Sequence, residues 1–92
     1  MRHRATPGFW AAYKALPGEV QRAANKQYEI LRSNPSHPSL GFKKIGELRG
    51  RELWSARITL AYRAIAAKKP DGYVWFWIGG HSTYEKLLSS GD

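Results

Sequence analysis

The chain has 92 residues, with fifteen Lys and Arg against seven Asp and Glu and a formal net charge of +8. That length supports one hydrophobic core, so we expect residues 1–92 to form a single domain. The positive charge favours polyanionic partners such as nucleic acid, an acidic protein segment or an anionic membrane surface. The sequence contains no cysteine, which excludes a disulfide framework and a thiolate metal site. It also lacks an apolar run long enough to span a membrane, and we expect a cytoplasmic protein with no metal or other cofactor.

The first third of the chain has helical periodicity. Thr6 followed by Pro7 is typical of a helix start, and it predicts a helix over residues 7–15. Its apolar residues repeat at helical spacing: Phe9, Ala12, Tyr13 and Leu16. Pro17 restarts a second amphipathic helix, which we expect to end near Ser33. Two prolines then make residues 34–39 a loop.

The rest of the chain is rich in β-branched and aromatic residues and predicts four strands. We place them at residues 40–45, 53–60, 61–67 and 73–79. Gly46 and Gly50 are expected to mark the first turn, and residues 68–72 a later hairpin turn. A short strand before Thr6 is also compatible with the pattern. Ser82, followed by Glu85 at capping-box spacing, predicts a short C-terminal helical turn.

This order of elements indicates an α+β fold, with two N-terminal helices packed on one face of a small antiparallel sheet. Strand alternation puts Arg57 on the more polar face of its strand. It also places Ala64 and Ala66 under the helices and directs Arg63 outward, where it would carry little packing. On the last strand, alternation separates Trp75 and Trp77 from Val74, Phe76 and Ile78, and either set could be core.

Basic residues on neighbouring strands form the candidate functional patch. We expect Arg57 and Arg63 to lie near His81, which follows the last strand, and near Tyr84. Guanidinium groups supply permanent positive charge and an imidazole can move a proton near neutral pH, a combination suited to phosphodiester chemistry. The alternative interpretation is a solvated arginine on an open sheet face and an incidental histidine.

Other polar residues give weaker signals. Lys43 and Lys44 alternate, so only one of them can share the face of the arginines, and such a pair often serves as a charged sheet edge. His3 and His37 have no spaced partners in the sequence, which gives a zinc site little support.

At three segments the chain resembles the RelE/ParE superfamily of type II toxins. These are residues 54–58 (Trp-Ser-Ala-Arg-Ile), residues 62–65 (Tyr-Arg-Ala-Ile) and the terminal Trp-Ile-Gly-Gly-His-x-x-Tyr that ends at Tyr84. Leu16-Pro17, Asn34-Pro35 and residues 40–45 follow the family order over nearly the whole chain. The resemblance implies a compact α+β toxin that a cognate antitoxin neutralises. RelE-like members enter the ribosomal A site and cut mRNA without a metal, by attack of a ribose 2′-hydroxyl on the adjacent phosphate.

The resemblance also implies roles for individual residues. Arg63 matches the catalytic arginine of the family and would stabilise charge on the phosphate, while Arg57 would position the backbone. His81 stands where relatives place an acid or base, and Tyr84 where some place an aromatic residue that stacks on or orients the nucleotide. Lys43 or Lys44 would hold phosphate.

The sequence departs from the family at one point. Some relatives carry a glutamate just before the first sheet strand as a candidate base, and Pro38-Ser39-Leu40 offers no carboxylate there. Three functions therefore stay open: a ribosome-dependent mRNA endoribonuclease, a ParE-like inhibitor of DNA gyrase, and a non-catalytic basic module that binds RNA or protein. The ParE branch tends to lack the catalytic set, so Arg63, His81 and Tyr84 favour the endoribonuclease.

Overall fold

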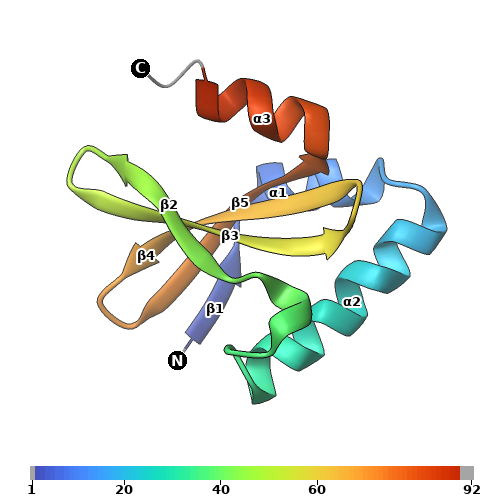
Figure 1. The fold of residues 1–92 in the computed structure, drawn as a ribbon, viewed down its shortest axis with the longest axis horizontal. Helices are drawn as coiled ribbons and strands as arrows, with labels where there is room; N and C mark the ends of the chain where they lie inside the picture. The colour runs from blue at the N-terminus through green and yellow to red at the C-terminus, as the bar shows by residue number, and fades with distance from the viewer. Residues whose placement is uncertain (1, 90–92) are drawn as a thin grey trace.

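The computed structural model describes residues 2–89 (Figure 1). The elements in chain order are β1 (Arg2–Ala5), α1 (Pro7–Lys14), α2 (Gly18–Ser33), the 3-10 helix η1 (Pro38–Leu40), β2 (Lys43–Leu48), β3 (Arg51–Thr59), β4 (Tyr62–Lys69), β5 (Gly72–Gly80) and α3 (His81–Ser89). The five strands form one sheet in the order β1-β5-β4-β3-β2, with β1 parallel to β5 and the other neighbours antiparallel. The predicted α+β class is confirmed.

The two N-terminal helices begin where the sequence predicts. The Oγ1 of Thr6 accepts the backbone N–H of Phe9 at 3.1 Å, which caps α1 one residue before Pro7. The hydroxyl of Tyr13 then donates to Oδ1 of Asn25 at 2.8 Å and so joins α1 to α2. The two helices pack on one face of the sheet, α1 against β5 and α2 against β3.

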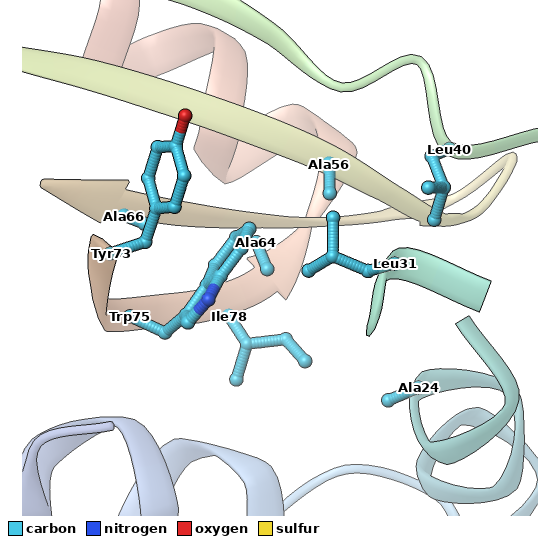
Figure 2. Close-up of a cluster of buried hydrophobic side chains, with 9 residues drawn as sticks. All are labelled: Ala24, Leu31, Leu40, Ala56, Ala64, Ala66, Tyr73, Trp75 and Ile78. Atoms are coloured by element: carbon cyan, nitrogen blue, oxygen red, sulfur yellow. The ribbon is translucent and has the colours of Figure 1, made fainter. Parts of the chain in front are cut away.

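The hydrophobic core lies between these helices and the sheet. Figure 2 shows its buried side chains: Ala24, Leu31, Leu40, Ala56, Ala64, Ala66, Tyr73, Trp75 and Ile78. The three alanines of β3 and β4 leave room for the helices to approach the sheet closely, while Leu40 is completely buried. Ala64 and Ala66 therefore lie under the helices, as strand alternation predicted.

A bulge in β5 overturns the predicted faces of the last strand. The pairing with β4 shifts between Trp75 and Trp77, which leaves Phe76 as an extra residue without a partner position. Trp75 and Ile78 are consequently both in the core, at 7% and 3% exposure. Trp77 lies on the opposite face, its ring 6.3 Å from that of Tyr84. The prediction that separated Trp75 from Ile78 was wrong because a bulge reverses the alternation.

Two other boundaries also differ from the prediction. The segment that ends at Leu40 is a 3-10 turn, closed by Gly41 in the left-handed region at φ 49°, so β2 begins only at Lys43. Gly46 lies inside β2 and not in a turn. The turn consists of Arg49 and Gly50, whose φ values of 52° and 80° suit a tight two-residue hairpin.

Strand β1 pairs with β5 at the edge of the last hairpin, which joins β4 to β5. Its turn contains only Pro70 and Asp71, shorter than the five residues predicted. A Cβ atom on Gly72 would collide with the backbone of Arg2, so a glycine at this position lets β1 pair closely with β5. The C-terminal helix α3 then follows β5 directly and lies away from α2 (Figure 1). It begins at His81, so Ser82 is inside the helix and does not cap it.

Candidate functional site

An open pocket of about 390 Å³ forms where the loop before β2, strands β3 and β4 and the start of α3 meet. Its lining residues are Pro35, Ser36, His37, Pro38, Gly41, Phe42, Lys43, Ser55, Arg57, Arg63, His81 and Tyr84. The set contains three permanent cations and two histidines, and among these lining residues there is no Asp or Glu. The arginines and His81 that the sequence expected to share a patch are therefore brought together.

The two arginines face each other directly across strands β3 and β4. Arg57 and Arg63 are paired positions in the antiparallel register, next to an irregularity in β3. Like charges at opposed positions destabilise a sheet. Among the ion pairs of residues 2–89, none involves Arg57, Arg63 or Lys43. The fold therefore holds an uncompensated positive charge at this point, which suits an anionic ligand.

Arg63 is bound to the backbone and does not extend freely outward. Its Nη1 donates to the carbonyl oxygens of Thr59 at 2.6 Å, Tyr62 at 3.0 Å and Leu60 at 3.4 Å. These bonds hold the guanidinium against the turn between β3 and β4. The expectation that Arg63 contributes little to packing was wrong. Its hydrogen-bond partners are main-chain carbonyl groups, which a sequence pattern does not reveal.

Arg57 is held differently, through its main chain. The carbonyl oxygen of Arg57 accepts from Nε2 of Gln27 at 2.8 Å, and the same amide donates to the carbonyl of Ser39 at 3.1 Å. Gln27 thus joins α2 to β3 and to the loop before β2, a role that its position in an amphipathic helix did not signal. The Nε of Arg57 is buried and has no hydrogen-bond partner. An unpaired buried donor requires an explanation, and this one belongs to a residue that lines the pocket.

His81 forms a carboxylate–imidazole pair. Its Nε2 lies 2.9 Å from Oε1 of Glu85, one helical turn further along α3, while its Nδ1 is buried without a partner. When Nε2–H donates to the carboxylate, Nδ1 carries the lone pair and can accept a proton. Glu85 was expected to reach back toward Ser82 in a capping box. It pairs with His81 instead, because the helix starts at His81, two residues earlier than a cap at Ser82 implies.

Tyr84 also lines the pocket, and its ring contacts the imidazole of His81. It is only 7% exposed, its hydroxyl donates to Oγ of Ser55 at 3.1 Å, and its ring stacks on His81 at 6.1 Å between centroids. The structure therefore packs Tyr84 against His81 and does not present an open ring face to a base. Ser55 is itself buried. Its sole sequence signal was a small polar residue on the same face as Arg57.

The two lysines of β2 point to different environments, as alternation predicted. Lys43 lines the pocket. Lys44 lies outside it, with Nζ 2.8 Å from Glu47 and 3.9 Å from Glu52. The hydrogen bond that Lys44 donates to Glu47 raises the pKa of Lys44, and the charge of Glu52 adds to this. Of the two candidates for phosphate contact, the structure brings only Lys43 to the site.

A second cavity, of about 200 Å³, lies beneath α1 and α2 and is lined mainly by apolar side chains. His3 is at its edge, where Nε1 of Trp75 donates to Nδ1 of His3 at 3.1 Å and burial lowers the pKa of the imidazole. In the described part of the chain, no group of three or more His, Asp and Glu side chains is placed to hold a metal ion. No helix within residues 2–89 is long and apolar enough to cross a membrane.

The fold and the cationic pocket define a small basic α+β protein. The family model of the ParE-like toxin domain matches residues 18–86. The chain therefore belongs to the ParE-like toxin family within the RelE/ParE superfamily, and the resemblance seen in the sequence is confirmed. No curated protein gives a significant sequence match.

Solved toxin structures share the fold at low sequence identity. RelE in the RelE–RelB complex from Pyrococcus horikoshii OT3 is 18% identical, with a TM-score of 0.67 over 86% of this chain and 92% of that one. RelE in the RelB–RelE antitoxin–toxin complex from Methanococcus jannaschii is 16% identical, with a TM-score of 0.68 over 91% and 96%. The YoeB/ParE toxin from Agrobacterium tumefaciens is 16% identical, with a TM-score of 0.65 over 88% and 99%.

Proposed function

We propose that this toxin is a ribosome-dependent, metal-independent mRNA endoribonuclease that acts in the cytoplasm. One observation carries the proposal: Arg57, Arg63 and Lys43 line one pocket beside the His81–Glu85 pair, and no carboxylate within residues 2–89 forms an ion pair with them. A protein that only used its surface to bind a partner would gain nothing from two opposed arginines and an imidazole with a free acceptor nitrogen. Phosphodiester cleavage can use both features, the cations to stabilise charge on the phosphoryl oxygens and the imidazole to accept a proton.

The proposed reaction follows from these placements. The imidazole of His81 accepts the proton of a ribose 2′-hydroxyl, and the 2′-oxygen attacks the adjacent phosphorus. The bond from phosphorus to the 5′-oxygen of the next nucleotide breaks and leaves a 2′,3′-cyclic phosphate. The leaving oxygen takes a proton from water, and the hydroxide that this forms takes the proton back from the His81 imidazolium. Arg57 and Arg63 stabilise the charge that develops on the phosphoryl oxygens, and Lys43 binds the backbone phosphate. Glu85 stabilises the imidazolium, and Tyr84 fixes the ring plane of His81.

The proposed partners are the ribosome with its mRNA and a cognate antitoxin. The solved RelE relatives from Pyrococcus and Methanococcus are each complexes with RelB, which supports an antitoxin for this chain as well. The net charge of +8 suits an acidic or amphipathic antitoxin segment and ribosomal RNA alike.

The test is cleavage of mRNA in a reconstituted translation reaction, with the cuts located by primer extension. We expect cuts within translated regions for the wild type and at least about 100-fold slower cleavage for His81→Ala, since a general base contributes on the order of 10²–10⁴ in rate. Both proteins keep His37 and Lys44, so that His81 is the only residue that differs between them. Equal cleavage by the two proteins would contradict the assignment of His81.

A second candidate is inhibition of DNA gyrase, which the match to a ParE-like family model favours. This function needs a protein-recognition surface and no proton transfer. Induction of the toxin would then arrest growth with double-strand DNA damage and intact mRNA, and His81→Ala would arrest growth as well as the wild type does.

A further inference from the structure

A residue of the loop before β2, His37, lines the same pocket as the two arginines. His37 precedes η1 and caps it: its Nδ1 accepts the backbone N–H of Ser39 at 3.1 Å and lies 2.9 Å from the hydroxyl oxygen of the same residue. A backbone N–H can only donate, so Nδ1 must supply a lone pair. The neutral ring therefore carries its proton on Nε2, which is a hydrogen-bond donor on the other side of the ring.

The loop that carries His37 is fixed relative to Arg57. The amide of Gln27 binds the carbonyl oxygens of Ser39 and Arg57 together. Gly41, at the other end of the loop, packs beside the guanidinium. A Cβ atom added to Gly41 would lie 3.8 Å from Nη2 of Arg57. The loop is thus fixed next to Arg57 at two points, at Ser39 through the Gln27 amide and at Gly41. These contacts place His37 beside the cations of the pocket.

We propose that His37 is a further substrate-binding residue of this pocket, whose Nε2–H donates to a non-bridging phosphate oxygen of an RNA strand. This inference rests on the proposed function and names a contact that the sequence did not suggest. The role is binding and not proton transfer, because Nδ1 is occupied by Ser39 and Nε2 already carries a proton. His81, by contrast, has its lone pair on the nitrogen without a partner.

The experiment uses the whole protein and a 2′-O-methylated RNA trinucleotide, which can bind but cannot be cleaved. His37→Asn is the test variant because asparagine keeps the cap on Ser39 and lacks the Nε2–H. We expect the dissociation constant to rise about tenfold, as for the loss of one hydrogen bond to a charged group, with the melting temperature unchanged. Ser33→Ala, at the end of α2 and outside this pocket, is the control and should bind like the wild type.

Nitrogen NMR of the histidine rings gives a second, independent measurement. We expect Nδ1 of His37 to show the shift of an acceptor nitrogen, and the Nε2–H signal to move when the trinucleotide is added. An Nε2–H signal that stays fixed on binding, equal affinity of His37→Asn and the wild type, or no binding by the wild type would each overturn the proposal. Binding through His37 without mRNA cleavage on ribosomes would leave this contact standing and would refute the endoribonuclease itself.

Discussion

Replacement of Arg57 by methionine should make the protein more stable and less active. The substitution keeps the aliphatic stem and removes the guanidinium. Two unfavourable features disappear with it: the directly opposed charge of Arg63 and the buried Nε without a partner. Opposed like charges cost about 0.2–1 kcal/mol in a sheet, and a buried unsatisfied donor costs about 1–3 kcal/mol, of which methionine recovers part.

We expect the free energy of unfolding of Arg57→Met to rise by about 0.5–2 kcal/mol. In a chain of this size, 1 kcal/mol corresponds to about 4–8 °C in melting temperature. Urea titration at low ionic strength measures the change directly. Added salt should reduce the part that comes from charge repulsion. mRNA cleavage should fall by about 100-fold or more, since a donor aimed at developing phosphoryl charge is lost.

Arg63→Met provides the matched comparison, because the two arginines occupy paired positions. Arg63 donates three hydrogen bonds to backbone carbonyls, so its replacement should lower the free energy of unfolding by about 1–2 kcal/mol. Cleavage should fall in both variants while stability moves in opposite directions. A loss of more than about 1 kcal/mol in Arg57→Met would refute the reasoning, since it would show that the Arg57 guanidinium supports the fold and is not held for a ligand.

Three further outcomes are expected. Tyr84→Phe removes the bond to Ser55 and should lower the free energy of unfolding by about 1–2 kcal/mol in urea titration; no change would show that the bond contributes nothing. Burial lowers the pKa of His3 in the folded protein, so the unfolded chain binds more protons in acid. The free energy of unfolding should therefore fall as the pH drops through about 6.5. His3→Gln should flatten this pH dependence in thermal melts at pH 5 to 8. Ribosome pelleting should weaken steeply between about 50 and 200 mM salt as phosphate contacts release counterions, and a flat response would point to a protein target.

The sequence predicted the regular parts of the fold because two periodicities were uninterrupted. Helical spacing located α1 and α2, and alternation placed Ala64 beneath the helices. Helical spacing and strand alternation both fail where a strand contains an extra residue or the backbone turns sharply. The extra residue at Phe76 reversed the faces of β5, and Gly41 in the left-handed region delayed β2. Neither feature has a side-chain pattern of its own, since each depends on how neighbouring strands and the loop pack.

The candidate site divides in the same way. The sequence predicts that Arg57 and Arg63 lie near each other because they stand on adjacent strands. Their direct facing depends on the register shift between Arg57 and Thr59, since the two-residue turn alone would pair Arg57 with Ala64. His37 and Gln27 reach the site from a loop and a helix that are distant along the chain. Their roles depend on main-chain carbonyl and N–H groups, which are identical in every residue and therefore leave no trace in the sequence.

The distribution of acidic residues explains why the pocket keeps its charge. Glu52 accepts a hydrogen bond from Trp54, which lowers the pKa of its carboxyl, and it lies 3.9 Å from both Lys44 and Lys68. Asp71 pairs with Arg2 and Arg4 at the far end of β5. Within residues 2–89 these carboxylates neutralise cations at the periphery of the sheet. Because Glu85 is engaged by His81, the opposed arginines are left to attract a polyanion.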